Sequence, residues 1–179
     1  MNLIEVQNLS DCLITTGSTS YGHVGYYAKN VYTTDDESKL ITSGDYLFYV
    51  DPEASSYLLK YAGTDTDLTL PNDINGNSYG IYQFVFAFNE DLTSIVLPST
   101  LTSIGRGAFN YCYNLTGDIV IPATVKSIGY NAFYDCSSLN SVIVSEGVKS
   151  IGDSAFRGCT NLVKLEIPKS ITSFGEDVF

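Results

Sequence analysis

The sequence predicts a repeat solenoid, in which coils of 23 or 24 residues stack along one axis. Four segments that begin at Leu92, Leu115, Leu139 and Leu162 align with one another at spacings of 23, 24 and 23 residues. Each segment has the same order of apolar, small and glycine positions, and each carries a phenylalanine at the same place. A coil of this length cannot bury its own apolar face, so its neighbours must cover it.

The shared template is L-x-x-I-x-I-P-x-x-V-x-x-I-G-x-x-A-F-x-x-C-x-x. The alternation in I-x-I is the period of a β-strand, so Ile95 and Leu97 face the core. The proline ends the strand because it lacks an N–H donor, and V-x-x-I returns the chain across the stack. We expect the glycine to supply free backbone dihedrals for a tight turn. The prediction is a right-handed array with a parallel sheet on one side and short turns, 3-10 or one-turn helices on the other.

Two columns of side chains are predicted to form the core. The phenylalanines should stack as one internal row, which consists of Phe86, Phe109, Phe133, Phe156 and Phe179. Cys112, Cys136 and Cys159 recur 24 and 23 residues apart. This spacing places them in successive coils, where parallel side chains do not converge as a disulfide requires, and it is not the short spacing of a zinc site. We therefore expect a ladder of buried thiols that act as small hydrophobes.

The regularity decreases toward the N-terminus of what we expect to be a single domain, residues 1–179. Residues 92–179 are regular, with the last repeat truncated, and residues 63–91 form an imperfect copy with the insertion NDINGNSYG. Residues 1–62 are predicted to be a divergent repeat, with Leu3–Val6 as its strand and Val24–Lys29 as an echo of I-G-x-x-A-F. The runs at 46–50 and 57–62 flank DPEASS, which predicts a β-hairpin that interrupts the solenoid. This hairpin is either a drifted repeat or an insertion with a ligand-binding loop.

The template resembles the BspA-like leucine-rich repeats of bacterial surface proteins, closely over residues 92–179 and with an insertion over residues 63–91. The resemblance implies a cell-surface or secreted protein that takes part in adhesion to host or neighbouring-cell molecules. It also implies a partner that is a protein or a glycan.

Composition limits the classes of partner. The formal net charge is -11, which argues against nucleic acid and against anionic membrane surfaces, because no basic patch can neutralise phosphates. No apolar run is long enough to span a bilayer, so we expect no membrane insertion. The N-terminal MNLIEVQNLSDCLITTG lacks the basic start and continuous apolar stretch of a secretory signal.

No pattern of residues indicates catalysis, a metal site or a cofactor. His23 is the single histidine, and no nucleophile and base are paired around it. The acidic groups at 35–37 and 65–67 lack the EF-hand pattern, so they are predicted to be solvated turns. Cys12 has no counterpart in the repeats. We expect a non-enzymatic protein without a cofactor.

The outward positions of the predicted strands form two rows that are candidate contacts on the concave face of the sheet. One row is Ser94, Asp118, Ser141 and Lys164, and the other is Val96, Val120, Ile143 and Glu166. Three aliphatic residues in line suggest a contact strip, although β-branched residues also favour strands for their own sake. The tyrosine-rich hairpin is a second candidate contact.

Two functions remain open from the sequence. The array either binds a ligand through its face, or it is a spacer or stalk that presents another module. Phe179 lies at the A-F position of an unfinished coil, and solenoids normally end in polar caps. We therefore expect a fragment of a longer array, in which an uncapped apolar end favours end-to-end self-association.

Overall fold

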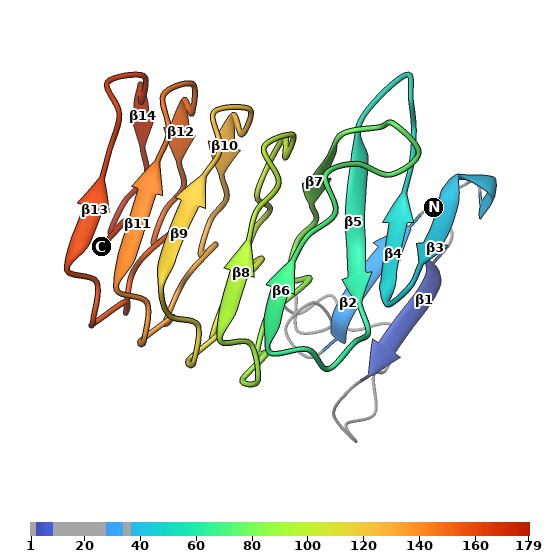
Figure 1. The fold of residues 1–179 in the computed structure, drawn as a ribbon, viewed down its shortest axis with the longest axis horizontal. Helices are drawn as coiled ribbons and strands as arrows, with labels where there is room; N and C mark the ends of the chain where they lie inside the picture. Colours follow the sequence, from blue (N-terminus) through green and yellow to red (C-terminus); the bar gives the residue numbers. More distant parts are fainter. Residues whose placement is uncertain (1–2, 9–27, 34–36) are drawn as a thin grey trace.

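The computed structural model describes residues 3–8, 28–33 and 37–179, and it is a β-solenoid of stacked coils (Figure 1). Each coil has three walls. One wall carries the I-x-I strands, the second carries the V-x-x-I segments, and the third carries the glycine-to-cysteine segment of the template. The predicted solenoid fold with a parallel sheet is confirmed.

The first wall, called here the front sheet, is parallel and built from the I-x-I segments. Figure 1 shows its strands side by side. Its hydrogen-bonded orders are β6-β8 and β9-β11-β13, and the amide of Thr116 joins the two groups by donating to the carbonyl of Thr93. The strands are β6 (Asp67–Thr69), β8 (Ser94–Val96), β9 (Asp118–Ile121), β11 (Ser141–Val144) and β13 (Lys164–Glu166).

The second wall also pairs as a parallel sheet, whereas the sequence predicted one parallel sheet with short turns, 3-10 or one-turn helices on the other side. Isolated bridges from Ile81 to Ile104 and from Ile104 to Ile128 connect its strands along the stack. The strands are β7 (Tyr79–Ile81), β10 (Ser127–Ile128), β12 (Ser150–Ile151) and β14 (Ser173–Phe174). Ile128, for example, pairs with Ile104 of the coil before it and with Ile151 of the coil after it.

The third wall, called here the turn wall, is made of tight turns, and none of its described residues is helical. Its coils are joined at alternate residues: the amides of Phe84, Phe86 and Phe88 donate to carbonyls of the next coil at 3.0, 2.9 and 2.8 Å. Within a coil, the amide of Ala108 donates to Gly105 at 3.3 Å. Two positions per coil have a left-handed backbone, as in Phe84 and Phe88, both with φ of 59°. A residue in this backbone conformation is strained unless it is glycine, asparagine or aspartate.

The glycine that follows isoleucine in the template is needed for close approach between coils. Gly105, Gly129 and Gly152 are not among the residues with positive φ, so the prediction that they supply unusual dihedrals is wrong. A Cβ on Gly129 would lie 2.6 Å from the carbonyl carbon of Gly105 and 2.7 Å from the amide nitrogen of Arg106. The backbones of neighbouring coils therefore meet where a side chain would stand.

The phenylalanine column runs through the core as a stack of nearly parallel rings. Centroid distances along it are 5.1, 4.9, 5.3 and 6.2 Å, from Phe86 to Phe179. The first four rings are buried, but Phe179 is 60% exposed. Phe179 continues the predicted stack on Phe156, but in this structure its ring is not buried as the other four are.

The N-terminal part differs most from the expected divergent repeat. Strands β1 (Leu3–Asn8) and β2 (Ala28–Thr33) pair antiparallel with each other, so β1 does not extend the front sheet. The 3-10 turn η1 (Glu37–Lys39) leads into a meander of β3 (Leu40–Ser43), β4 (Tyr46–Tyr49) and β5 (Ser56–Tyr61). Cys12, His23, Asp35 and Asp36 lie outside the described residues.

The predicted hairpin is the antiparallel pair β4-β5, but it extends the solenoid instead of interrupting it. β5 pairs in parallel with β7 in the second sheet, with Leu58 opposite Ile81. Phe48 and Leu58 are fully buried, and the ring of Phe48 lies 5.0 Å from that of Tyr79. The hairpin thus covers the apolar face of the first coil in the way that another coil would.

Candidate functional site

The outward rows of the front sheet lie in register, as the sequence predicts, and they begin one strand earlier. Ser141 pairs with Asp118 and with Lys164, and Ile143 pairs with Val120 and with Glu166. On β6, Asp67 pairs with Ser94 and Thr69 pairs with Val96. The sequence reasoning missed Asp67 and Thr69, although Leu68 between them aligns with the strands of the later repeats.

The apolar row is open to solvent at two of its three members. Val96 is 58% exposed and Val120 is 49% exposed, whereas Ile143 is half-buried. Ile143 has a paired strand on both sides, with Glu166 beside it in register, and this neighbour accounts for its lower exposure. We call Val96, Val120 and Ile143 the apolar strip.

Some residues of the polar row already form hydrogen bonds with neighbours in the sheet. The Ser94 hydroxyl donates to the Asp67 carboxylate at 2.6 Å, and the Thr93 hydroxyl donates to the same oxygen at 3.1 Å. These hydrogen bonds, that of Ser94 first, hold the pKa of Asp67 below its ordinary value. Because the Ser94 hydroxyl already donates its hydrogen to Asp67, Ser94 is a poor candidate for contact with a ligand.

Ser141 is buried, at 5% exposure, which corrects its assignment to the exposed row. It lies between Asp118 and Lys164, and both of these longer side chains are exposed. Its hydroxyl oxygen has no hydrogen-bond partner among the described protein groups. A buried polar atom without a protein partner calls for an explanation. Lys164 and Glu166 form an ion pair at 3.2 Å on the same face.

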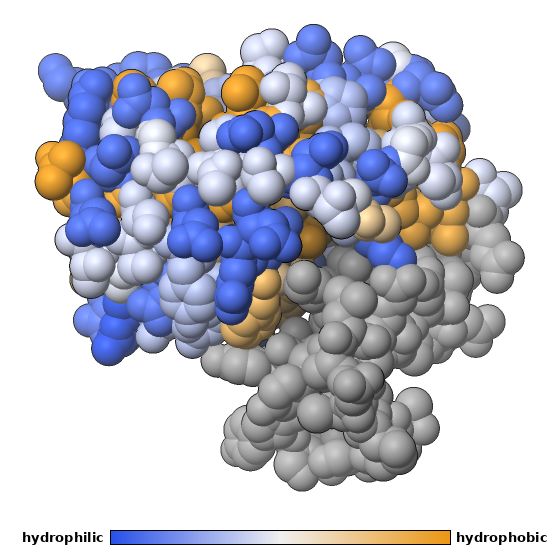
Figure 2. All heavy atoms as spheres, turned by 60° about the horizontal axis from the view of Figure 1, so that its bottom comes forward, coloured by the Kyte–Doolittle hydropathy of each residue, from blue (hydrophilic) through white to orange (hydrophobic). Residues whose placement is uncertain are grey.

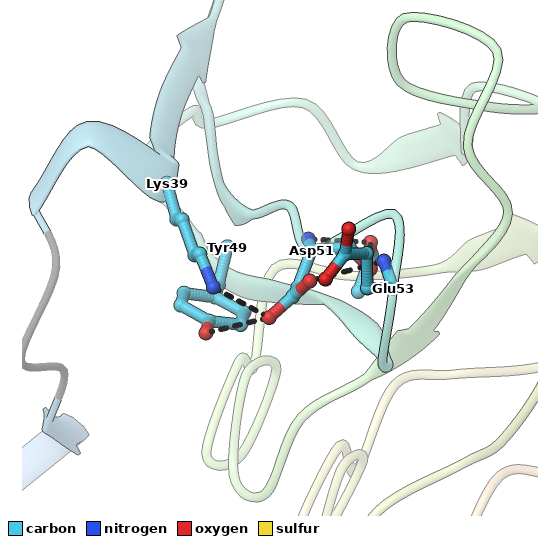
Figure 3. A network of polar contacts seen from close by, with 5 residues as sticks. Lys39, Tyr49, Asp51 and Glu53 are labelled. Atoms are coloured by element: carbon cyan, nitrogen blue, oxygen red, sulfur yellow. Dashed lines mark hydrogen bonds and ion pairs between the residues drawn. The ribbon is translucent and has the colours of Figure 1, made fainter.

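The tyrosine-rich hairpin has an ordered turn instead of an open loop, as the close-up in Figure 3 shows. The ammonium of Lys39 lies 2.7 Å from the Asp51 carboxylate, which also accepts from the Glu53 amide at 3.1 Å. The Lys39 hydrogen bond is the main reason that the pKa of Asp51 lies below its ordinary value. Tyr49 contributes a weaker contact at 3.4 Å. This network holds the DPEASS turn in place.

The cysteine column forms a ladder of free thiols. The thiols of Cys112, Cys136 and Cys159 donate to the carbonyls of Phe86, Phe109 and Phe133 in the preceding coil, at 3.0, 3.1 and 3.1 Å. The first two are buried and the third is half-buried. Burial raises the pKa of the Cys136 thiol, so this sulfur is protonated at neutral pH and is a weak nucleophile. The ladder ties adjacent coils together.

Asp65, before β6, and Asp67, the first residue of β6, are also accounted for by local contacts. Asp65 accepts a hydrogen bond from the Tyr61 hydroxyl at 3.2 Å, and Asp67 binds Ser94 as described above. Within the part of the chain that the structure describes, no three histidine, cysteine or acidic side chains are grouped as metal ligands would be. Over the same residues, no helix has the length and hydropathy to cross a membrane.

A family model for the BspA type leucine rich repeat region matches residues 79–179, in 6 copies. The chain belongs to this family. The match confirms the resemblance that the template suggested, and it begins at β7, upstream of the regular repeats. The leucine-rich repeats thus include the coil that carries the imperfect copy.

Several solved leucine-rich repeat proteins are similar to this chain. One from Bacteroides ovatus is 26% identical with a TM-score of 0.66, and the match covers 78% of this chain and 38% of that one. One from Bacteroides capillosus is 24% identical with a TM-score of 0.59, covering 77% and 99%. A leucine-rich repeat protein of T. pallidum is 26% identical with a TM-score of 0.49, covering 75% and 85%. No curated protein matches the chain.

Proposed function

We propose that this chain is a non-enzymatic binding module of a cell-surface or secreted protein, and that it contacts a protein or a glycan through the front sheet. The observation that carries the proposal is the apolar strip, with Val96 58% and Val120 49% exposed in adjacent coils. Membership of the BspA-type family supports presentation at the cell surface.

The polar row beside the strip suits a ligand that offers hydrogen-bonding groups. Asp118 and Lys164 are exposed on either side of the buried Ser141 hydroxyl, which has no described protein partner. A ligand hydroxyl or amide that hydrogen-bonds with Asp118 or Lys164 would lie over this oxygen. Aliphatic contacts along one row and hydrogen bonds along the other give affinity and orientation together.

The test is a binding screen of the chain against matrix proteins and a glycan array, followed by variants of each interaction found. Val96→Glu with Val120→Glu is the informative pair, because both side chains are exposed and the fold should tolerate the change. Thr102→Glu with Thr172→Glu is the matched control, since it adds the same charge at exposed positions beside the second sheet. We expect binding to be lost in the first pair and kept in the second. If every interaction survives in the first pair, the front sheet is the wrong site.

A spacer is the second candidate, and the continuous bonding between coils favours it. Backbone hydrogen bonds join neighbouring coils along all three walls, which gives a rod in which each coil supports the next. A spacer needs stiffness but no ligand. A chain that binds nothing in the screen, and whose front-sheet variants leave the adhesion of the whole protein unchanged, would support the spacer over the binding module.

A further inference from the structure

Arg106 on the turn wall lies between aromatic rings of the two neighbouring coils. Its guanidinium carbon is 4.9 Å from the ring centroid of Tyr130 in the following coil and 5.8 Å from that of Phe84 in the preceding one. The backbone fixes this order, because the Phe84 amide donates to the Arg106 carbonyl at 3.0 Å and the Gly107 amide donates to the Tyr130 carbonyl at 2.8 Å. Both ring contacts are within the range of a cation–π interaction, so the rings hold the guanidinium in place.

Phe84 is an unusual residue for its backbone conformation. Its φ is 59°, and the same position holds Gly107, Asn131 and Ser154 in the later coils. A phenylalanine is strained in the left-handed region, and strain of this kind is concentrated at functional sites. A Cβ on Gly107 would lie 2.6 Å from Cδ1 of Phe84. The ring of Phe84 therefore lies where it does only because Gly107 has no side chain.

Arg106 is exposed and has no ion pair within the described part of the chain. The protein has 20 acidic and 9 basic residues, so carboxylates are abundant, and Lys39, Arg157 and Lys164 each pair with one. Asp153, in the same column as Arg106, accepts instead from a backbone amide of the following coil at 2.9 Å. Figure 2 shows that the described residues on one face of the molecule are mainly hydrophilic. An arginine held by rings is a departure on such a surface.

A guanidinium held in this way is prepared to bind a carboxylate. The rings attract its charge but do not accept the hydrogen bonds of its N–H donors. A carboxylate accepts two parallel hydrogen bonds from a guanidinium, and a side chain that is already fixed loses little freedom on binding. The neighbours of Arg106 in its column are Gln83 and Tyr130, whose amide and hydroxyl suit the hydroxyls of a sugar. Tyr130 is 42% exposed, so a ligand can reach it.

The charge of the protein limits the class of carboxylate. At a formal net charge of -11, the protein repels a ligand with many negative charges, such as an acidic peptide or a sulfated chain, more than a ligand with one. A glycan that ends in a sugar acid offers one carboxylate, several hydroxyls and a ring that packs against tyrosine. This class of ligand fits both the donors at the site and the charge around it.

We propose that Arg106 binds the carboxylate of a glycan that ends in a sialic or uronic acid, and that Phe84 and Tyr130 are positioning residues that hold its guanidinium. The site lies on the turn wall, apart from the front sheet. The proposal does not depend on the binding role of the front sheet.

The test is an NMR titration of the 179-residue chain with four probes. Sialyllactose and a disaccharide that ends in glucuronic acid are the two sources of the carboxylate, lactose is the neutral control, and a triglutamate peptide is the acidic alternative. We expect one or both acid sugars to bind, with an affinity that falls as salt is added, and we expect lactose and the peptide not to bind. The sugar that binds identifies the acid.

Variants of the three residues separate binding from structure. Arg106→Lys keeps the charge but not the planar fork, so it should weaken binding about tenfold, and Arg106→Gln should abolish binding. Arg157→Gln is the matched control, since it removes the same charge from an exposed position on the same wall. Phe84→Asn installs the residue type of Asn131, so the protein should be at least as stable in urea, yet it should bind about threefold more weakly.

Several results would overturn the proposal. They are binding of lactose as tight as that of the acid sugars, binding that survives Arg106→Gln, binding of the peptide in place of the sugars, and no binding of either acid sugar. Unchanged binding in Phe84→Asn would remove the positioning role. The pair Val96→Glu with Val120→Glu should leave this binding intact, so failure of the front-sheet proposal is distinguishable from failure of this one. Loss of sugar binding in that pair would place the site on the front sheet and overturn the assignment to Arg106.

Discussion

Replacing Gly129 by alanine tests whether the repeat glycine exists for close approach between coils. The added Cβ would lie 2.6 Å from the carbonyl carbon of Gly105, where ordinary contact begins at 3.4 Å. The coils must therefore separate locally by about 0.8 Å, the difference between these two distances. That separation stretches the hydrogen bond from the Gly129 amide to the Ile104 carbonyl, which is 2.9 Å long. Both obstructing groups are backbone, so no rotamer change relieves the clash.

The sign of the effect distinguishes the two explanations for this glycine. At a position with ordinary dihedrals and free space, alanine stabilises a protein by about 0.4–1 kcal/mol, because the unfolded chain loses entropy. Overpacking costs about 1–3 kcal/mol, and a backbone clash belongs near the upper end. We expect a net loss of about 2 kcal/mol, which lowers Tm by about 4–8 °C in a domain of this size.

Urea unfolding followed by circular dichroism and by tyrosine fluorescence gives the free energy, provided that the two transitions coincide. Gly117 supplies the contrast, because it has φ of 81° and open space around its Cβ. Asparagine tolerates a left-handed backbone better than alanine does, so Asn should be the milder substitution at Gly117 and not at Gly129. A Gly129→Ala protein that is as stable as the wild type would refute the close-approach explanation.

Three further predictions concern single positions. Phe133→Ala should lower the free energy of unfolding by about 3–5 kcal/mol, whereas Phe179→Ala, at a ring that is 60% exposed, should lower it by less than about 1 kcal/mol; equal losses in urea unfolding would contradict the burial pattern. Ser154→Gly should stabilise the protein by about 0.5–1 kcal/mol, because relief of the left-handed strain at φ of 53° exceeds the entropy that glycine adds to the unfolded chain; a loss of stability there would be evidence against this strain. The pKa of Asp51 lies below its ordinary value of 3.8, so its contribution to stability is present above that pH and is lost as the pH falls through the lower folded-state value. Asp51→Asn should therefore destabilise the protein at about pH 7 and much less near pH 3, and a pH-independent difference would show that the carboxylate charge is not responsible.

The fold was predictable from the sequence because the residues that recur in every repeat are those that pack in the core. Columns that face inward must be filled at each coil, so the spacing of their residues is enough to locate the strands and the phenylalanine row. The same spacing locates the glycine, but it does not reveal what the glycine does. A residue without a side chain fits either an unusual φ or a close contact, and only the position of the neighbouring backbone decides between them.

The N-terminal part was harder because strand periodicity carries no information about direction. Alternation over Leu3–Asn8 is equally compatible with parallel and antiparallel pairing, and the structure pairs this strand antiparallel with Ala28–Thr33. Ser141 illustrates a second limit. An outward position predicts exposure only when the neighbouring side chains are short, and Ser141 lies between Asp118 and Lys164.

In a solenoid, residues that depart from the repeat are more informative about function than residues that follow it. Packing explains the inward columns completely, as it does for Ala108, Ala132 and Ala155, all of which are fully buried. Outward columns are free to vary, so an apolar residue that is kept there needs another cause. Val96 and Val120 lie in a row whose first and last members, Thr69 and Glu166, are polar. Both valines are solvent-exposed, and exposed apolar side chains favour contact with another molecule. This is why the front sheet carries the proposed function, and the regular interior carries none.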